Sequence, residues 1–547
     1  MEPERQVEIQ LGHLCNNRCV FCVSGQRTEM GDARPLPLQP ILKQISDAFE
    51  RGHRKLTLLG GEPTLQPTFF DVVRHATDLG FEEIVIFTNG VKTSRAWFVD
   101  QLLAIGAPLS FRISLQGATK DAHEATTGRP RSFDRIKRSL ELLHRAGQTI
   151  TLNMCVVQSN YASVPAFADL VQPFGVTQLH LDMMRPLDAG IRTEEELRRT
   201  IPRYSDLAAP LREMQTNFSP GFDVNIGNLP PCIVPELASI IHHDGETTET
   251  VAIDADDRLS KPWNKYLVKK RDKIKKPSCR ECILNDRCSG VYETYANFYG
   301  LEEFQPISAE LLREKDSSLK LAGHWLRPVV ERLITSFSSA EVPFDLIRSS
   351  ARSDEAGVGI AVVSKATSST KLIVRLGNAG DHRSVFARFE SFSFSVEFCG
   401  SRSFSDAALM APLDEHTCVT AAEIIQILVS QLEALGERLV VPFSSGAAKG
   451  SVLRRLERLI ARAPFKGLVW KSSQLASDGR RAELLFEAEE GQTLSVWFAE
   501  EEIRKEGSRP SRRATGGYRL GSGEATPVLR EALTELLHTM RVSSLQR

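Results

Sequence analysis

The stretch His13–Gln26, HLCNNRCVFCVSGQ, contains Cys15, Cys19 and Cys22 in the spacing Cys-x3-Cys-x2-Cys, a few residues after an apolar, strand-like run. Three thiolates this close in a loop can face one point, and thiolates are the ligands of iron–sulfur clusters. A [4Fe–4S] cube has four irons, so three cysteines leave one iron open to a ligand that is not protein. Phe21 would help to shield such a cluster from water. The alternative is zinc, which usually takes four protein ligands in structural sites.

Length and composition describe an ordinary globular protein with several domains. At 547 residues the chain is long enough for two to four domains, and its contents of 41% hydrophobic and 25% charged residues are typical of such proteins. A net charge of −1 gives no general argument for binding nucleic acid or an anionic membrane. The N-terminus MEPERQVEIQLG has no apolar signal segment, and no run reaches the length of a membrane span. Ten cysteines without an export signal indicate thiols, metal or clusters in a reducing cytoplasm.

Short apolar runs alternate with longer amphipathic segments from Gln6 to about Met184. This alternation predicts a parallel sheet covered by helices, an α/β fold. The expected strands are Val7–Leu11, Lys55–Leu59, Glu83–Phe87, Pro108–Ser114, Thr149–Val157 and Gln178–Met183. The expected helices are Pro40–Arg51, Phe69–Leu79, Arg95–Ile105, Phe133–Ala146 and Val164–Val171.

Polar motifs follow the ends of these strands. Gly60-Gly61-Glu62-Pro63 follows the second strand, where two glycines allow a close backbone approach and a carboxylate can accept hydrogen bonds from an ammonium group. A plain turn into a helix would use the same residues. Thr88-Asn89-Gly90 follows the third strand. Ser114 and Asn153 lie in the fourth and fifth strands, and the sixth carries or precedes His180, Asp182 and Arg185, all of which could face a bound cofactor or substrate. A polar residue at a strand end is more often a cap or a satisfied core group.

The cysteine spacing with Phe21, the Gly60–Pro63 motif and the Thr88–Gly90 turn together resemble the radical S-adenosylmethionine (SAM) enzymes. The resemblance implies a partial (β/α)6 TIM-type barrel, here residues 1–225, with its site at the C-terminal strand ends. It implies that SAM chelates the open iron of a cluster on Cys15, Cys19 and Cys22. The cofactor-binding positions it implies are Gly60, Gly61, Glu62, Pro63, Thr88, Asn89, Ser114 and Asn153.

A second cysteine group lies in the region 226–322. Cys279, Cys282 and Cys288 stand in the spacing Cys-x2-Cys-x5-Cys, and Cys232 supplies a possible fourth thiolate. Four cysteines satisfy either a fully ligated [4Fe–4S] cluster or a structural zinc. The core spacing resembles the SPASM and twitch extensions of radical SAM peptide-modifying enzymes, although Tyr292 stands where a full SPASM run has another cysteine. The resemblance implies one auxiliary cluster that transfers electrons or holds the substrate pocket together.

Two further features of this region have simpler interpretations. The basic run 268–276, VKKRDKIKK, predicts a solvated face, with a docking strip for an acidic leader peptide or a phosphate-rich substrate as the alternative. Cys155, Cys399 and Cys418 have no partner spacing, so we expect core thiols.

An internal repeat occupies the C-terminal half. Glu-Arg-Leu-Ile, Pro-Phe, a double serine and an aspartate recur in that order from Glu331 and from Glu457. Strands are expected at 371–376, 386–398, 483–486 and 493–498, and closing helices at Ala421–Leu435 and Pro527–Met540. We therefore expect two α+β units, 323–442 and 451–547, joined by the flexible segment 444–450. The charged stretch Glu500–Arg513 is expected to be a solvated loop.

The resemblance implies an enzyme that reductively cleaves SAM to a 5′-deoxyadenosyl radical and abstracts hydrogen from a substrate. The auxiliary element favours a ribosomally made peptide or protein as substrate. The reductant is expected to be a protein such as flavodoxin or ferredoxin. Because the first strand begins within ten residues of Met1, no leader-recognition module is expected before the barrel, and the repeats would have to serve instead. The alternatives are an enzyme acting on a small molecule or cofactor precursor, and a cluster-containing scaffold without activity.

Overall fold

The computed structural model describes residues 5–219, 221–242, 248–254, 256–338, 344–365, 370–377, 387–389, 393–398, 439–440, 468–475, 481–488, 491–503, 511–521, 526–540 and 545–546. The chain forms two compact units, Met1–Ile307 and Ser308–Arg547. None of the helices within the described residues is long and apolar enough to cross a membrane.

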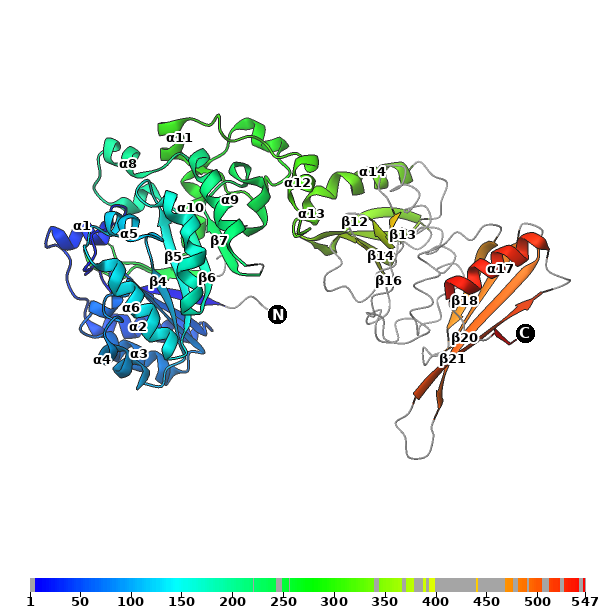
Figure 1. The fold of residues 1–547 in the computed structure, drawn as a ribbon, viewed down its shortest axis with the longest axis horizontal. Coiled ribbons are helices and arrows are strands. Elements are labelled where there is room, and N and C mark those ends of the chain that lie inside the picture. The colour runs from blue at the N-terminus through cyan, green and yellow to red at the C-terminus, as the bar shows by residue number, and fades with distance from the viewer. Residues whose placement is uncertain are drawn as a thin grey trace. The chain divides into compact units, whose positions relative to one another are not determined.

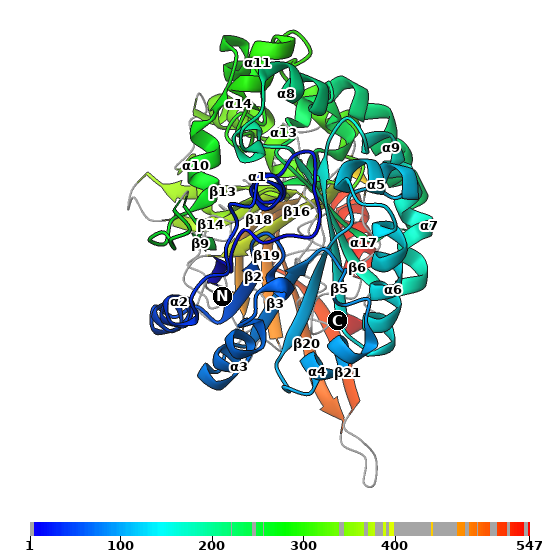
Figure 2. The same ribbon diagram turned by 90° about the vertical axis from the view of Figure 1, so that its left-hand side faces the viewer.

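The first unit is built on a parallel sheet of nine strands in the order β8-β7-β6-β5-β4-β3-β2-β1-β9 (Figures 1 and 2). The strands are β1 Gln6–Gln10, β2 Lys55–Leu59, β3 Glu83–Thr88, β4 Leu109–Ser114, β5 Thr149–Val156, β6 Val176–Met183, β7 Asp223–Gly227, β8 Ile241–His242 and β9 Thr248–Val251. The predicted α/β fold with six parallel strands in sequence order is confirmed, with strand bounds within two residues of those expected.

Helices connect these strands on one side of the sheet (Figure 2). They are α1 Val23–Glu29, α2 Leu38–Glu50, α3 Phe69–Leu79, α4 Ala96–Leu103, α5 Lys120–Thr127, α6 Ser132–Arg145 and α7 Phe167–Val171, with short 3-10 helices η1 Pro63–Leu65, η2 Tyr161–Ala166, η3 Gln172–Phe174 and η4 Pro186–Ala189. The helix expected at Val164–Val171 is divided between η2 and α7. Pro165, which has no backbone N–H, lies in the 3-10 portion.

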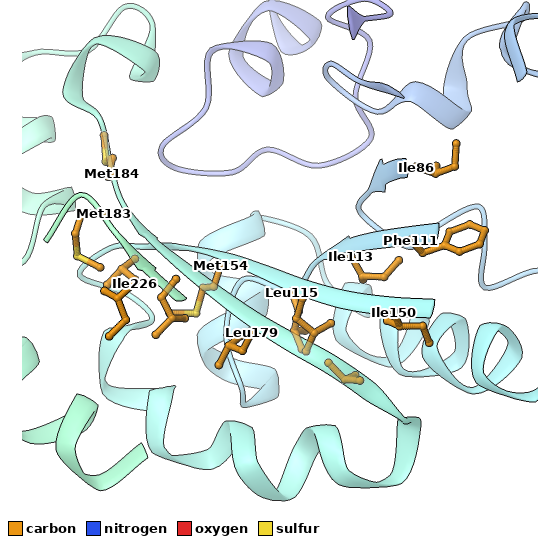
Figure 3. Close-up of a cluster of buried hydrophobic side chains, with 14 of the residues drawn as sticks. Ile86, Phe111, Ile113, Leu115, Ile150, Met154, Leu179, Met183, Met184 and Ile226 are labelled. Atoms are coloured by element: carbon orange, nitrogen blue, oxygen red, sulfur yellow. The ribbon is translucent and has the colours of Figure 1, made fainter. Parts of the chain in front are cut away.

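Alternate residues of each strand face opposite sides of the sheet. One side is apolar and fully buried, and it includes Ile113, Met154, Leu179 and Ile226, which Figure 3 shows gathered from neighbouring strands. These side chains form one core cluster with helix residues such as Ile136 of α6. The other side carries polar residues at the intervening positions and lines an interior cavity. The sheet therefore has a dry outer face and a polar inner face.

Three strands lie beyond the six that the sequence predicts. β9 returns to pair in parallel with β1, with Gln6 opposite Thr248, and β7 pairs with β6. β8 has two residues, too few to produce a periodic pattern in sequence. The expected division at residue 225 falls inside β7, and the boundary between the compact units lies at Ile307, not at 322.

The rest of the first unit surrounds the second cysteine group. A two-stranded antiparallel pair, β10 Lys273–Ile274 and β11 Val291–Tyr292, brackets the three clustered cysteines. The helices of this region are α8 Glu194–Thr200, α9 Ala208–Asn217, α10 Lys265–Arg271 and α11 Glu293–Tyr299, with η5 Tyr204–Leu207, η6 Pro231–Ile233, η7 Pro235–Ile240 and η8 Pro277–Glu281.

The second unit contains two sheets whose described strands pair antiparallel, except for the parallel pair β21 and β22. The first sheet has the order β12-β13-β14-β16-β15-β17 and the second β18-β19-β20-β21-β22. Each begins with a strand that carries the repeated double serine and a register irregularity, β12 at Ser349 and β18 at Ser472. The strands are β12 Phe344–Asp354, β13 Gly357–Ser364, β14 Thr370–Gly377, β15 Ala387–Phe389, β16 Ser393–Phe398, β17 Leu439–Val440, β18 Leu468–Leu475, β19 Arg481–Ala488, β20 Thr493–Ile503, β21 Ser511–Leu520 and β22 Leu545–Gln546.

The helices of this unit are α12 Ala309–Lys315, α13 Ala322–Trp325, α14 Arg327–Ser338 and α17 Pro527–Met540, the last with the bounds predicted. The predicted helix 421–435, the linker 444–450, the second copy's start at Glu457, and the thiols Cys399 and Cys418 lie outside the described residues.

The solvated loop expected at Glu500–Arg513 is wrong for residues 500–503 and 511–513, and residues 504–510 lie outside the described part of the chain. β20 and β21 extend into this stretch and pair antiparallel, which places Glu501 opposite Arg513 and Glu502 opposite Arg512. The described ends of this stretch are therefore paired strand.

Candidate active site

The cysteine loop after β1 is fixed by the glycine turn after β2. The Gly61 N–H donates to Gly12 O at 2.7 Å, and the Glu62 N–H donates to Leu14 O at 2.7 Å. Gly60 has φ +146°, and a Cβ added there would lie 2.7 Å from Gly12 O. A Cβ at Gly61 would lie 2.5 Å from Leu14 O and closer still to His13 O. The close backbone approach predicted for these glycines is thus made to the chain's own cysteine loop.

Glu62 is buried, and its carboxylate accepts four hydrogen bonds from within the chain. Oε1 accepts from the Thr64 N–H at 3.1 Å, from Thr64 Oγ1 at 2.5 Å and from Thr88 Oγ1 at 2.7 Å, while Oε2 accepts from the Asn89 N–H at 2.7 Å. Burial raises the pKa of Glu62, although these donors oppose the shift. The carboxylate therefore joins the glycine turn to the Thr88–Gly90 turn.

The Thr88–Gly90 turn in turn contacts the cysteine loop. Asn89 Nδ2 donates to Asn16 Oδ1 at 2.7 Å and lies 3.9 Å from Cys15 Sγ. The Asn17 N–H lies 3.4 Å from the same sulfur. N–H groups directed at a sulfur stabilise its thiolate form, the form that binds metal. The predicted site residues Glu62, Thr88 and Asn89 are thus brought against Cys15.

The three thiols of the first group lie close together. Burial raises the pKa of Cys15 to about 12, with the Glu62 charge as the next cause. Burial also raises the pKa of Cys19 well above its usual value, and the neighbouring Cys22 and Cys15 add to the shift. Buried, mutually repelling thiolates need a cation to deprotonate them, so this donor set fits a cluster held by three cysteines. Among the described residues, no group of three or more His, Cys, Asp or Glu is arranged to hold a single metal ion.

Cys155 packs against the core cluster, as expected of a core thiol, but it is partly exposed. It stands on β5 two residues after Asn153, hence on the same polar face, and opposite Asp182 of β6. Burial raises the pKa of Cys155, and the charges of Asp182 and Cys22 add to the shift. The signal in the sequence was that Cys155 stands two residues after Asn153, because residues two apart in a strand share a face.

The remaining predicted strand residues form a row across the sheet. Ser114 pairs with Asn153, Asn153 with His180, and His180 with Asn225. Burial lowers the pKa of His180 to about 4, so its imidazole is neutral at physiological pH. Ser114 and Asn153 face the inner side of the sheet, and the cofactor contacts predicted for them stay a prediction.

Arg185, predicted to face SAM or substrate, is engaged elsewhere. Its guanidinium donates to the Asp272 carboxylate through Nε at 2.6 Å and through Nη2, and Nη1 donates to Asp188 at 3.0 Å. It therefore connects the end of β6 to the segment between α10 and β10.

The four cysteines of the second group are brought together. Cys232, Cys279, Cys282 and Cys288 line one small cavity whose other walls include Ile274, Leu284, Val291 and Phe304. Burial raises the pKa of Cys232 to about 12, and Cys288, Cys282 and Cys279 add to the shift. The Gly290 N–H points to Cys288 Sγ at 3.3 Å and the Ile307 N–H to Cys282 Sγ at 3.4 Å. Cys232, about fifty residues upstream in the sequence, thus completes a set of four thiols in an apolar pocket.

The basic run 268–276 is a solvated face only in part. Lys270, Arg271 and Lys275 are exposed as expected, whereas Lys269 and Lys273 are largely buried. Lys269, Lys270 and Lys273 line the cavity of the sheet. Sequence reasoning did not identify their cavity partners Arg112, Asn228 and Ser289. Arg112 stands two residues before Ser114, so strand alternation could have placed it on the same face.

Comparison with known proteins gives a family for the N-terminal part. Residues 9–171 match the family model of the radical SAM superfamily. The AdoMet-dependent heme synthase of Methanosarcina barkeri is 28% identical over 33% of this chain and 51% of its own length. A probable GTP 3',8-cyclase of Saccharolobus solfataricus is 30% identical over 34% of this chain and 59% of its own length. The chain therefore spans little more than half the length of these two relatives.

Solved structures resemble this chain at low sequence identity. Streptococcus suis SuiB bound to S-adenosylmethionine is 14% identical, with a TM-score of 0.39 over 55% of this chain and 76% of its own. The FeFe-hydrogenase maturase HydG of Carboxydothermus hydrogenoformans is 12% identical, with a TM-score of 0.33 over 60% of this chain and 79% of its own.

We predict that Gly61→Ala lowers the iron bound after anaerobic reconstitution by about four atoms per chain. The added Cβ would overlap His13 O and Leu14 O and displace the cysteine loop. Gly147→Ala is the control, because a Cβ there meets nothing within 4 Å and its φ of +68° costs about 1 kcal/mol. Full iron content in Gly61→Ala would show that the loop does not depend on this backbone contact.

Proposed function

We propose that this chain, whose residues 9–171 match the family model of the radical SAM superfamily, is an enzyme that cleaves SAM reductively and abstracts hydrogen from a substrate. The observation that carries the proposal is that hydrogen bonds from the neighbouring turns hold the three-cysteine loop in place. Cys15, Cys19 and Cys22 lie together after β1, each partly buried, and the turns after β2 and β3 hold that loop in place by backbone and carboxylate hydrogen bonds.

The chain's own residues bind, orient and shield. When bound, a [4Fe–4S] cluster supplies the electron that cleaves SAM to methionine and a 5′-deoxyadenosyl radical. Cys15, Cys19 and Cys22 would hold this cluster through three thiolates. Gly60–Pro63, Thr88, Asn89, Ser114 and Asn153 would bind SAM beside it, and the polar inner face of the sheet would receive the substrate. Packing of the outer face against the helices keeps the site rigid.

Glu62 has a positioning role in this proposal besides its predicted contact with the SAM ammonium group. Its carboxylate is buried and already accepts hydrogen bonds from Thr64, Thr88 and Asn89. An ammonium group would have to share those oxygens. Loss of the carboxylate would therefore disturb the loop that holds the cluster as well as the binding of SAM.

The second cysteine group would hold an auxiliary [4Fe–4S] cluster, with zinc as the alternative. Full ligation by Cys232, Cys279, Cys282 and Cys288 leaves no iron for substrate. Its contribution would be electron transfer or support of the substrate cavity. Support of the substrate cavity is the better supported role, because Ser289, the residue after Cys288, lines that cavity.

For the substrate we propose a ribosomally made peptide or protein, because the second cysteine group resembles SPASM and twitch elements. In the second unit, β12 is the edge strand of its sheet, and an edge strand can accept an extended peptide by strand addition. The names of the curated relatives favour the alternative, a small molecule or cofactor precursor. Flavodoxin or ferredoxin would supply the electron.

We predict that the protein reconstituted anaerobically with iron and sulfide binds about eight irons, as two [4Fe–4S] clusters. Replacing Cys15, Cys19 and Cys22 together by Ala should leave about four. Metal analysis and electron paramagnetic resonance measure this. Tightly bound zinc at Cys232, Cys279, Cys282 and Cys288 would contradict the auxiliary cluster without affecting the first.

We predict that the dithionite-reduced protein cleaves SAM to 5′-deoxyadenosine without its true substrate, measured by liquid chromatography. The triple Cys→Ala variant is the control and should form none, since no thiolates remain to hold the cluster. Iron-loaded wild type that forms no 5′-deoxyadenosine would support the scaffold interpretation instead.

We predict that Glu62→Ala lowers both the iron content of the first site and the affinity for SAM, the latter by about ten- to a hundredfold. Iron analysis and equilibrium binding of SAM separate the two effects. Thr88→Ser is the matched control, because it keeps the hydroxyl that donates to Glu62 Oε1. Weaker SAM binding with full iron would make Glu62 a ligand of SAM without a positioning role.

A further inference from the structure

We propose that the interior cavity of the first unit binds an anionic group of the substrate, a phosphate or a carboxylate, between Arg112 and Lys273. The inference rests on the proposed function in one respect, that the ligand is the substrate. The binding itself is a property of this chain's own residues.

The cavity has a volume of about 220 Å³ and lies on the polar inner face of the sheet. Its walls come from β1, β4, β6 and β7, and from the segment that follows the sheet, which contributes α10, Lys273 and Ser289. Arg112 of β4 and the basic run 268–276 are more than a hundred residues apart in the sequence, yet they line one site.

The cavity is rich in positive charge. Four basic residues line it in the described part of the chain, against one carboxylate, that of Asp182. Asp182 is already neutralised, because its Oδ2 lies 3.3 Å from Lys269 Nζ and its Oδ1 accepts from Asn228 Nδ2. Despite burial, the Lys269 charge holds the pKa of Asp182 well below its usual value. Burial lowers the pKa of His180, so its imidazole is neutral and adds no charge to the cavity.

The guanidinium of Arg112 has no hydrogen-bond or ion-pair partner within the described residues. Its central carbon lies 5.6 Å from the centroid of the Phe87 ring. The Arg112 charge helps to lower the pKa of Glu8 and of Glu83, but both carboxylates already have other partners. Glu8 is paired with Lys265, and Glu83 Oε2 lies 2.5 Å from Lys55 Nζ. A guanidinium presents a planar fork of donors that matches a carboxylate or a phosphate. Arg112 therefore lacks the partner for which its geometry is suited.

Lys273 is the second cation without a carboxylate. Its Nζ donates to Asn228 Oδ1 at 2.7 Å and to Ser289 Oγ at 2.8 Å, and it lies 4.9 Å from the Tyr292 ring centroid. These partners are neutral, and an ammonium group has a third hydrogen to donate. Burial lowers the pKa of Lys273 to about 8. An anionic ligand would stabilise the charged form.

The ligand should also carry a hydrogen-bond donor. Asn225 lines the cavity, and its Oδ1 is buried with no partner in the structure. An unsatisfied buried acceptor is costly, as are buried charges without counter-charges. A ligand with an anionic group and an adjacent N–H or O–H would satisfy Arg112, Lys273 and Asn225 together.

The position of the cavity suits a substrate. Asp182 of the cavity lies opposite Cys155 in the pairing of β6 with β5, and the Cys22 charge helps to raise the pKa of Cys155. At the other end, Lys273 donates to Ser289, the residue that follows Cys288 of the second group. An anion held between Arg112 and Lys273 would thus lie between the two cysteine groups and present the rest of the substrate toward the SAM site.

The test is calorimetric titration of the reconstituted full-length protein, unreduced, with three probes: inorganic phosphate, glutarate and neutral N-methylacetamide. We expect phosphate or glutarate to bind and N-methylacetamide not to bind. Phosphate alone assigns a phosphate ester, and glutarate alone assigns a carboxylate. Arg112→Gln and Lys273→Gln should each weaken binding by about ten- to a hundredfold, and Arg112→Lys by less, since it keeps the charge.

The exposed residues Arg145 and Lys261 provide matched controls, Arg145→Gln and Lys261→Gln, which should bind as wild type does. Thermal unfolding of each variant checks its folding. Absence of binding by both anions, equal binding in the Arg112 and Lys273 variants, or displacement of the anion by SAM would overturn the proposal. Because no reductant is present, loss of SAM cleavage with retained anion binding would refute the proposed function alone.

Discussion

Two backbone hydrogen bonds, from Gly61 N–H to Gly12 O and from Glu62 N–H to Leu14 O, fix the loop on which the candidate site depends. They exist because β1 and β2 are adjacent and parallel, so the segments after both strands leave the sheet at the same edge. No residue with a Cβ fits at Gly61 without displacing that loop. The metal-ligand geometry is therefore determined by a contact between two backbones.

The buried carboxylate of Glu62 extends this arrangement to a third strand. It accepts hydrogen bonds from Thr88 and Asn89 after β3, and Asn89 contacts the cysteine loop again. A buried carboxylate is costly unless its hydrogen-bonding capacity is filled, and here four donors fill it. Three consecutive strand ends are thus coupled, which restricts movement of the thiols relative to the inner face of the sheet.

The inner face connects the two cysteine groups. In a closed hydrophobic barrel this face would be packed with apolar side chains, but here it carries Arg112, His180, Asp182 and Asn225 around a cavity. The polar residues are tolerated because the opposite face of the same strands supplies the core. The segment that holds the second cysteine group completes the cavity through Lys273 and Ser289, so the cluster region and the substrate region are parts of one structure.

The sequence alone determined the elements whose signal is local: six strands and their order, α3 and α17 to the residue, the two cysteine spacings and the strand-end motifs. Tertiary structure decided what depends on distant residues. β9 joins β1 from some 240 positions away, Cys232 joins Cys279, and Lys269 and Lys273 of the basic run line one cavity with Arg112 and Asp182. Periodicity and spacing report a residue's local conformation, whereas the partner that a side chain meets is set by how the sheet brings separate segments together.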